Sequence, residues 1–370
     1  MLRFLTAGES HGPMLSLIVE GLPADLRLSR AALDRDLARR QRGYGRGGRM
    51  HIERDRARIT AGLRGGRTLG SPLAVTIENA DWVNWRDRMD PMRPASTTGI
   101  LKRPRPGHAD LVGALKYDRA DIRDVLERAS ARETAARVAV GGVARALLAS
   151  FGVGIGSWVE RIGTAVMPPT PLDPAALAHR AEASDVRCPD PKTAAAMRRA
   201  IDRARVRGDS LGGVFTVAAW GLPPGLGSHV HWDRRLDHRI GGAMFSIPAV
   251  KGVAFGLGFD AAALPGSRVH DVITYRAGRG YGRRTNHAGG LEGGMTSGAP
   301  LCVRVAKKPI ATLKTPLASV ELDTHARRRA GYERSDVCAV PAAAVVGEAV
   351  LAWVLAAAWM EKLGGDAMGE

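Results

Sequence analysis

Two twelve-residue segments in opposite halves of the chain share one glycine-rich pattern. They cover residues 62–73 and 290–301, and both fit GL-x-GG-x-T-x-G-x-PL. Gly-Leu-Pro occurs ahead of each segment, at 21–23 and 221–223, and Glu-Arg follows each, at 127–128 and 333–334. Turns rich in glycine and proline can resemble one another by chance, which would explain the Gly-Leu-Pro pair taken alone. Three matches in the same order favour an internal duplication instead.

The same order of elements is predicted in both halves: a strand, a helix, two strands and a long helix. In the first half we expect strands over 14–20, 58–63 and 73–78, a helix from its cap Ser29 to about residue 40, and the long helix over 130–150. In the second half we expect a strand over 213–220, a helix over 233–245 and the long helix after Pro341. The 370 residues are therefore predicted to form one domain, with repeat halves of about 1–150 and 210–363 and a helical insertion of about 172–208.

The segment 39–50 contains five arginines and four glycines and no carboxylate. Glycine lets a backbone approach a ligand closely, and a guanidinium matches the oxygens of phosphate or carboxylate. A flexible basic loop on a basic protein is the simpler alternative. We favour an anion-binding loop, because a solvated basic face is more often lysine-rich and interleaved with acids.

The formal net charge of +17 predicts an anionic partner. Only 5% of the residues are aromatic, and none alternates with the basic clusters as a base-stacking platform requires, so a small phosphorylated substrate is favoured over nucleic acid. No signal peptide is recognisable. The longest apolar run, 341–359, is interrupted by Gly347 and Glu348. Three cysteines without metal spacing suggest a reducing cytosol, so we expect a cytoplasmic protein with no membrane partner.

His11 and His108 lie in separate loops flanked by glycine. A lone histidine is most often a surface residue or a hydrogen-bonded core residue. Two of them, in a chain with arginine-rich loops, are candidates for proton transfer near neutral pH. Neither has partners at metal-ligand spacing, so no metal is predicted. Asp336, close to Arg334, is either a carboxylate base kept ionised by that guanidinium or a turn residue ahead of a helix.

Two further segments are suited to anions. Ser130 and Glu133 form a capping-box pattern, which predicts a helix N-terminus where an anion could sit beside Arg128 and Arg132. Taken alone, that pattern is better explained as a structural cap. The segment 307–312 begins with two lysines and suits another phosphate or the edge of a cofactor ring. Neither a dinucleotide-binding fingerprint nor a P-loop pattern is present.

Taken together, the motifs resemble those of the chorismate synthase family. The resemblance runs from residue 1 to about 363 and rests on GESHG at 8–12, the loop 39–50, PRPGHADL at 104–111, ERASARET at 127–134, RRTN at 283–286, GGMT at 293–296 and ERSD at 333–336. It implies an α+β fold, namely a β-α-β sandwich with an internal pseudo-twofold duplication. It also implies a carbon–oxygen lyase of the shikimate pathway to aromatic amino acids. That enzyme forms chorismate from 5-enolpyruvylshikimate 3-phosphate by 1,4-anti elimination of phosphate, requires reduced FMN and assembles as a homotetramer.

The resemblance also implies roles for particular residues. As catalytic groups it implies His11, an acid beside the leaving phosphate, His108, which would protonate or stabilise the reduced flavin, and Asp336, which would help to remove the C6 proton. The implied substrate-binding residues are Arg40, Arg46, Arg49, Ser130, Arg132 and Arg334. The implied cofactor-binding residues are Arg40, Arg46, Arg128, Ala129, Ser130, Pro248, Ala249, Gly293, Lys308, Pro309, Ile310, Ala311, Thr312 and Arg334. Among these, Arg40 and Arg46 match positions associated with NADPH use in bifunctional members.

Two positions depart from the family pattern. Ala129 stands where serine is often found, and Pro248 stands where asparagine or glutamine is frequent. Any flavin contact at these positions must use backbone atoms, and Pro248 has no N–H to offer. No additional segment corresponds to a flavin reductase, so we expect an external reductase, with NADPH acting only as a reductant of the flavin. Two alternatives stay open: a nucleic-acid-binding protein, and a different flavin enzyme that catalyses net oxidoreduction of a phosphorylated metabolite.

Overall fold

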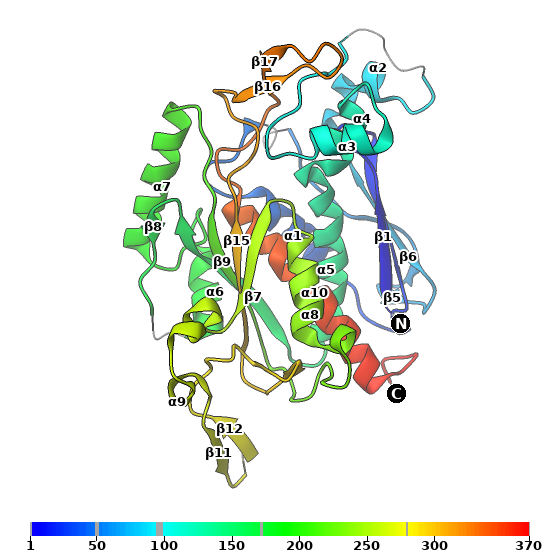
Figure 1. The fold of residues 1–370 in the computed structure, drawn as a ribbon. Helices are drawn as coiled ribbons and strands as arrows, with labels where there is room; N and C mark the ends of the chain where they lie inside the picture. Colours follow the sequence, from blue (N-terminus) through cyan, green and yellow to red (C-terminus); the bar gives the residue numbers. More distant parts are fainter. Residues whose placement is uncertain (1, 49–51, 94–98, 171–172, 279, 370) are drawn as a thin grey trace.

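The computed structural model describes residues 2–48, 52–93, 99–170, 173–278 and 280–369. Within these ranges the chain forms two large antiparallel sheets with a layer of helices between them, together with four two-stranded hairpins (Figure 1). Both sheets turn an apolar face to the helices, which bury it. The α+β class and the β-α-β layering predicted from the resemblance are confirmed.

The first sheet has the strand order β1 (Arg3–Ala7), β2 (Met14–Glu20), β6 (Leu73–Glu78) and β3 (Arg58–Ala61). In β2 the side chains of Leu15, Leu17 and Val19 are buried, whereas Met14 and Ile18 are exposed, as the two-residue period of a one-sided strand requires. The predicted strands over 14–20 and 73–78 are confirmed. The strand predicted over 58–63 ends at residue 61, because Gly62 adopts a φ of 80° and leads into a separate hairpin.

The second sheet has the order β10 (Val250–Phe255), β15 (Leu301–Lys307), β9 (Gly213–Trp220), β7 (Gly154–Ile162) and β8 (Ala165–Val166). Its central strand β9 is buried on both sides, because α10 (Val340–Leu363) packs on one face and α6 (Pro174–Glu182) on the other. Helix α7 (Pro191–Val206) packs against β7 and β8. The helices α6 and α7 occupy the positions predicted for the insertion and cover the outer face of this sheet (Figure 1).

Four helices form the central layer. Helix α5 (Thr134–Ala149) packs along α10, α1 (Arg30–Gln41) packs against α5, and α8 (Leu236–Phe245) packs against α10. The first of these contacts is close, since a Cβ added at Gly141 of α5 would lie 2.2 Å from the Cβ of Ala349. Helix α10 is long and apolar enough to cross a membrane, but 94% of its most apolar window is buried inside the protein. It is packed as a core helix.

The repeated pattern forms equivalent hairpins in the two halves: β4 (Leu63–Arg64) with β5 (Arg67–Thr68), and β13 (Leu291–Glu292) with β14 (Met295–Thr296). The Oγ1 of Thr68 donates to the carbonyl of Pro23 at 2.6 Å and accepts from the N–H of Leu26 at 2.9 Å. Thr296 makes the same two bonds, at the same distances, with residues 223 and 226. The order β1-β2-β6-β3 in one sheet corresponds to β7-β9-β15-β10 in the other. These paired contacts support the repeat, while the domain and repeat boundaries stay a prediction.

Two helix starts differ from the prediction. Ser130 caps a 3₁₀ turn, Ala131–Glu133, by accepting from the N–H of Arg132 at 3.3 Å, and α5 begins only at residue 134. The capping box with Glu133 is therefore wrong, and the Glu133 carboxylate instead accepts from Arg137 at 2.8 Å. The helix predicted over 233–245 is divided into a 3₁₀ turn, Trp232–Arg234, and α8. The N-cap of α1 is confirmed, with the Ser29 hydroxyl accepting from Ala32 at 3.3 Å.

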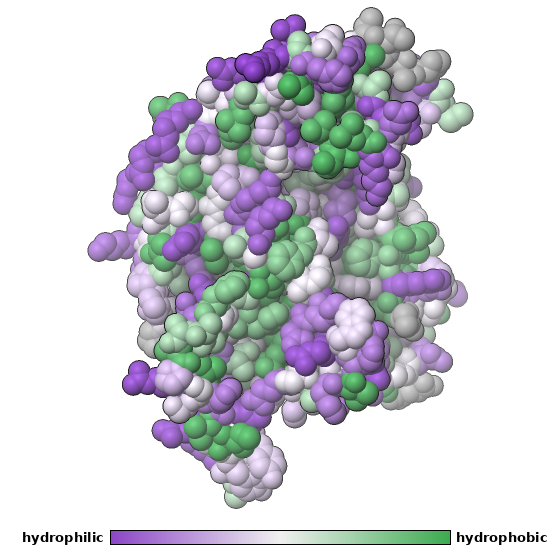
Figure 2. All heavy atoms as spheres, in the orientation of Figure 1, coloured by the Kyte–Doolittle hydropathy of each residue, from purple (hydrophilic) through white to green (hydrophobic). Residues whose placement is uncertain are grey.

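Shorter elements complete the described chain. The remaining helices are α2 (Arg86–Met89), α3 (Asp110–Tyr117), α4 (Arg123–Ala129) and α9 (Gly266–Val269), with 3₁₀ turns Ala80–Asn84 and Gly258–Ala263; the remaining strands are β11 (Ile273–Arg276), β12 (Gly280–Arg283), β16 (Ala318–Val320) and β17 (Arg327–Arg329). The β11–β12 hairpin projects at one end of the molecule and the β16–β17 hairpin lies at the other (Figure 1). Figure 2 shows hydrophilic residues gathered over β16 and β17, and apolar residues across the middle of the same face.

Candidate active site

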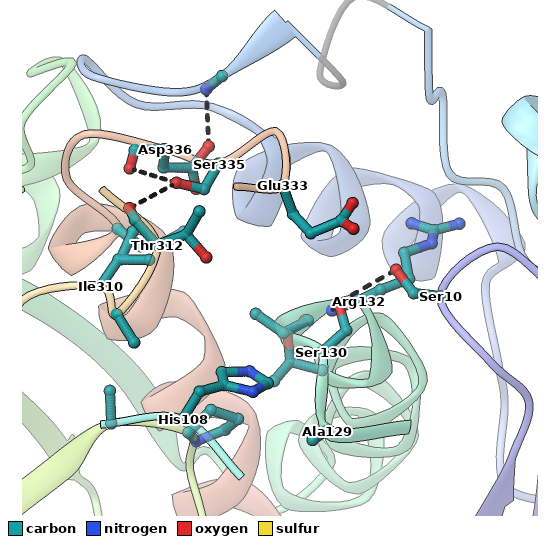
Figure 3. Close-up of a pocket in the computed structure, with 18 of the residues that line it drawn as sticks. Ser10, His108, Ala129, Ser130, Arg132, Ile310, Thr312, Glu333, Ser335 and Asp336 are labelled. Atoms are coloured by element: carbon teal, nitrogen blue, oxygen red, sulfur yellow. Dashed lines mark hydrogen bonds between the residues drawn. The ribbon is translucent and has the colours of Figure 1, made fainter. Parts of the chain in front are cut away.

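A cavity of about 510 Å³ brings together loops from both halves of the chain. Its size is typical of sites for small molecules and cofactors. Most of the residues that the resemblance implies line it: His11, Arg40, Arg46, His108, Ala129, Ser130, Arg132, Pro248, Ala249, Lys308, Ile310, Ala311, Thr312, Arg334 and Asp336. In Figure 3 His108, Ser130, Ile310 and Thr312 surround a common space, with Asp336 and Ser335 at one end and Ser10 and Arg132 at the other.

Arg40 supplies a buried positive charge at the end of α1. Its guanidinium donates to Thr134 Oγ1 at 2.9 Å through Nε and to the carbonyl of Ala131 at 2.7 Å through Nη2. Its Nη1 has no hydrogen-bond partner among the described residues, although Asp55 lies 3.6 Å away. Burial lowers the pKa of Arg40 to about 10, which still leaves it charged at neutral pH. A buried donor without a partner is costly, so this group is suited to an anion in the cavity.

Arg46 lies in the loop after α1 and is tied to Asp336. Its Nη1 donates to Asp336 Oδ2 at 2.6 Å, and the backbone N–H of Gly47 donates to Oδ1 of the same carboxylate at 2.7 Å. The sequence left open whether Asp336 is paired with Arg334 or is a turn residue. Arg334 donates instead to the buried Asp81 at 2.7 Å, and the guanidinium beside Asp336 is that of Arg46.

The imidazole ring of His11 is held at its Nδ1 edge by Glu127 and on one face by Trp85. Its Nδ1 lies 2.9 and 3.0 Å from the two carboxylate oxygens of Glu127, and its ring stacks on Trp85 with centroids 3.9 Å apart. Glu127 is buried on α4. Burial alone would raise the pKa of Glu127, but hydrogen bonds from His11 and the charge of Arg123 hold it below its ordinary value. The carboxylate is therefore ionised at neutral pH.

His108 has an equivalent arrangement ahead of α3. Its Nδ1 lies 2.5 Å from Oδ1 of the buried Asp110, and Arg105 donates to both oxygens of that carboxylate, at 2.7 and 2.9 Å. Burial opposes ionisation of Asp110, but the bonds from His108 and Arg105 lower its pKa below its ordinary range. In both histidines the Nδ1 faces a carboxylate, and both residues line the cavity.

Serines and Arg132 form the wall at the start of α5. The hydroxyls of Ser10 and Ser130 lie 3.1 Å apart. Arg132 is buried, donating to Asp55 at 2.6 Å and to the Asn79 side chain at 2.8 Å. Arg132 thus hydrogen-bonds the Asp55 carboxylate directly, whereas the Nη1 of Arg40 lies 3.6 Å from the other oxygen of the same group.

The opposite wall is mostly apolar. It contains Ile247, Pro248, Ala249, Ile310, Ala311, Ala339, Ala342, Ala343 and Val346. Lys307 lies among them and donates to the carbonyl of Pro248 at 2.7 Å. Burial lowers the pKa of Lys307 to about 8. Lys308 donates to the carbonyl of Gly107 and thereby joins this wall to the His108 loop.

Three of the predicted residues that the structure describes are not part of the cavity lining. Arg128 donates instead to the carbonyls of Gly8 and Thr6, at 3.1 and 2.8 Å. Gly293 is in the turn between β13 and β14, and Pro309 is not part of the lining either. Arg49 lies outside the described residues.

Sequence reasoning missed several residues that build the site: Trp85, Arg105, Asp110, Arg123 and Glu127. Asp110 and Glu127 stood inside the recognised motifs, two residues after His108 and directly before Arg128, yet nothing local assigned them to histidines. Trp85 lies in an irregular, proline-containing excursion and gave no signal. Among the described residues, no group of three or more His, Cys, Asp or Glu side chains gathers as a metal ion would need.

Comparisons with known proteins identify the family of this chain. A family model described as "Chorismate synthase" matches residues 2–360. A chorismate synthase of Symbiobacterium thermophilum is 59% identical over all of this chain and 96% of its own length, and one of Aquifex aeolicus is 54% identical over all of this chain and 95% of its own length. A solved structure titled "Crystal Structure of Chorismate Synthase" superposes with a TM-score of 0.81 at 46% identity and covers 100% of this chain and 94% of that one. The chain therefore belongs to the chorismate synthase family.

Proposed function

We propose that this protein forms chorismate by 1,4-anti elimination of phosphate from 5-enolpyruvylshikimate 3-phosphate, with reduced FMN as cofactor. As a member of its family, the protein is a carbon–oxygen lyase of the shikimate pathway. The observation on which the reaction rests is that His11, His108 and the guanidiniums of Arg40, Arg46, Arg132 and Arg334 line a single cavity. Expulsion of phosphate develops negative charge on the leaving oxygens, and cations already in place stabilise that charge most effectively in a site with little water.

The arginines bind and orient the anionic substrate. Arg40 is the clearest candidate for a phosphate or carboxylate contact, because its buried Nη1 lacks a hydrogen-bond partner among the described residues. Arg46 donates to Asp336 and Arg334 donates to Asp81, and both arginines line the cavity, so we assign them to the anionic groups of the substrate. Arg132 is neutralised by Asp55 and is better suited to shaping the wall.

His11 is the proposed acid for the leaving phosphate. With Nδ1 held at Glu127, Nε2 is the ring nitrogen whose proton would be given to an oxygen of the departing group. His108 is the proposed partner of the flavin. Asp336 is the proposed carboxylate that assists removal of the C6 proton, and its bonds to Arg46 and Gly47 hold it in place.

The cavity fits reduced FMN. One wall is apolar and made of small side chains, which suits a flat ring, and Lys307, Lys308, Thr312 and Arg334 add polar groups around it. Ala129 and Pro248 both line the cavity. Because neither has the polar side chain that is frequent at its position in the family, any contact with the flavin there would be made by backbone atoms. When bound, reduced FMN supplies electron density transiently, which no amino-acid side chain can do.

The remaining expectations also belong to this proposal. NADPH would act only as a reductant of the flavin, with Arg40 and Arg46 as the residues that could contact it, and an external reductase would deliver reduced FMN. A homotetramer in the cytoplasm is proposed, without a nucleic-acid or membrane partner. Sedimentation velocity of the purified chain tests the assembly directly.

The decisive experiment is an anaerobic assay with 5-enolpyruvylshikimate 3-phosphate and photoreduced FMN, following chorismate by its absorbance. We expect turnover without net oxidation of the flavin. His11→Ala should reduce kcat by roughly 10²-fold or more, the usual range for a lost general acid. His231→Ala is the matched control, because His231 is exposed, pairs with Asp233 and is not part of the cavity, so its turnover should equal that of the wild type.

Other outcomes would reject the proposal. Stoichiometric flavin oxidation would indicate an oxidoreductase. Full activity of His11→Ala would remove the acid role from that residue. Sub-micromolar binding to DNA or RNA with a steep salt dependence, in the absence of turnover, would favour the alternative that this is a nucleic-acid-binding protein.

A further inference from the structure

Glu127 binds His11 at two places. Its Oε2 accepts from the backbone N–H of His11 at 2.8 Å, and its two oxygens lie 2.9 and 3.0 Å from the ring Nδ1. The backbone carbonyl of Glu127 also accepts from the N–H of Ser10 at 3.0 Å. One residue of α4 therefore fixes the backbone and the ring of a residue 116 positions away.

The carboxylate is itself held in position. Arg123, one turn earlier on α4, donates to Glu127 Oε1 at 3.0 Å and has its second contact with Glu333 at 3.5 Å. The Arg123 guanidinium also lies 4.9 Å from the Trp85 ring centroid, on whose ring His11 stacks. Arg123, Trp85 and Glu127 thus hold the imidazole on its face and on its Nδ1 edge, and neither Arg123 nor Glu127 lines the cavity.

This contact determines which nitrogen is protonated. An ionised carboxylate can only accept hydrogen bonds, so the Nδ1 beside it must carry a proton in both the charged and the neutral ring. When the ring is neutral, Nε2 is then the unprotonated atom, and when the ring is charged, the proton that can leave is the one on Nε2. Without this constraint a neutral imidazole could present either nitrogen.

We propose that Glu127 is a positioning residue that holds the His11 ring in the Nδ1–H tautomer, so that Nε2 is the nitrogen that gives and takes the proton. It acts through His11 and does not touch the substrate. This proposal rests on the proposed acid role of His11. By keeping a proton on Nδ1, the Glu127 carboxylate would return the ring to the same tautomer after each turnover. The competing explanation is that Glu127 only completes a buried ion pair with Arg123.

The test compares Glu127→Gln with Glu133→Gln. Glutamine has nearly the same shape but can present either an oxygen or an NH₂ group to Nδ1, so it no longer dictates the tautomer. Glu133 is the matched control: it is also buried, pairs with an arginine one turn later, Arg137, and does not line the cavity. Thermal unfolding of each variant shows that it is folded before any other measurement.

Two readouts distinguish positioning from structure. We expect Glu127→Gln to lower kcat by roughly 10²-fold, the order expected when a general acid loses its orientation, with KM within about threefold of the wild type. In ¹⁵N spectra of the histidine rings, recorded where the rings are neutral, the His11 signals should show the Nδ1–H form in the wild type and in Glu133→Gln, and a mixture of tautomers in Glu127→Gln. Assignment uses the signals that disappear in His11→Ala.

Unchanged His11 signals together with wild-type kcat in a folded Glu127→Gln enzyme would overturn the proposal. So would an equal loss of kcat in Glu133→Gln, because the effect would then be one of general destabilisation. A failed acid role gives a different result: His11→Ala would keep full turnover, while the tautomer measurement would still report whether Glu127 orients the ring.

Discussion

Arg46 and Asp336 form an ion pair of 2.6 Å in the lining of the cavity, joining residues 290 positions apart. The Arg46 side chain is 11% exposed and that of Asp336 is 18% exposed, so solvent screens this pair only weakly. Gly47 approaches so closely that an added Cβ would lie 2.7 Å from the carbonyl oxygen of Ser335. The arginine-rich loop is thereby held against the segment that leads into α10.

Replacing Asp336 by asparagine should impair both binding and turnover. An amide cannot accept from Arg46 and Gly47 with both of its groups, so the guanidinium should lose its fixed orientation and the proposed base is removed. We expect kcat to fall by roughly 10²-fold and KM to rise several-fold, measured in the anaerobic chorismate assay. Asp237→Asn breaks a more exposed arginine pair outside the cavity and should leave both parameters unchanged. Wild-type kinetics in Asp336→Asn would contradict the role given to this carboxylate.

Glu348 should be one of the most stabilising polar residues of the core. It is fully buried on α10 and accepts from Arg39 at 2.8 and 2.9 Å, from Arg145 at 2.8 Å and from Arg187 at 3.0 Å. Glu348→Gln would leave these cations undercompensated, so we expect a loss of about 3–5 kcal/mol in the free energy of unfolding. Urea unfolding measures the change. Glu361→Gln breaks an exposed pair on the same helix and should cost at most about 1 kcal/mol.

The contribution of Glu348 should also depend on pH. Burial opposes its ionisation, but the charges of Arg39, Arg187 and Arg145 lower its pKa well below its ordinary value of 4.5. A carboxyl group whose pKa is lowered by folding stabilises the protein above its unfolded pKa, and this contribution is lost as the pH falls toward the folded pKa. The difference in stability between wild type and Glu348→Gln should therefore be constant near neutral pH and shrink below about pH 4.5. If the stability difference between wild type and Glu348→Gln grew on acidification, folding would not lower the pKa of Glu348.

Gly141 should be required for the contact between α5 and α10. A Cβ at this position would overlap Ala349, with its Cα only 2.3 Å away, so the helices would have to separate. We expect Gly141→Ala to cost about 1–3 kcal/mol or more despite the higher helix propensity of alanine. Gly241→Ala, on α8 with nothing within 4 Å of the added Cβ, should be neutral or stabilising by up to about 1 kcal/mol. Equal effects of the two substitutions, in chemical unfolding, would argue against tight helix packing.

Lys307 should make anion binding weaken in alkaline solution. Burial lowers its pKa to about 8, so the cavity loses one positive charge above that pH. The inhibition constant of sulfate, a dianion that does not titrate in this range, should rise between pH 7 and pH 9. Lys307→Met should bind sulfate more weakly at pH 7 and lose most of that pH dependence, whereas Lys192→Met, at an exposed position of α7, should behave as the wild type. An identical pH profile in Lys307→Met would assign the effect to another group.

Local chemistry made much of the fold predictable. The alternation in β2, the Ser29 cap of α1 and the turn glycines of the two repeated hairpins all depend on residues a few positions apart. The start of α5 was predicted incorrectly because a pattern that is plausible locally was overridden by another contact. The Ser130 pattern is locally compatible with a capping box, but Glu133 is drawn to Arg137 and the first turn is a 3₁₀ turn.

The sequence by itself determined the family and the layered α+β architecture, and most of the site residues it predicted line the cavity, because these features are expressed in contiguous motifs and in short-range periodicity. Only the tertiary structure decided how those residues are paired. It placed Glu127 on His11, Asp336 on Arg46 and Asp81 on Arg334, and it turned Arg128 away toward Thr6. The physical reason is that a charge takes whichever partner the packed sheets and helices bring within about 3 Å, and sequence spacing says little about that distance when the partners are more than a hundred residues apart.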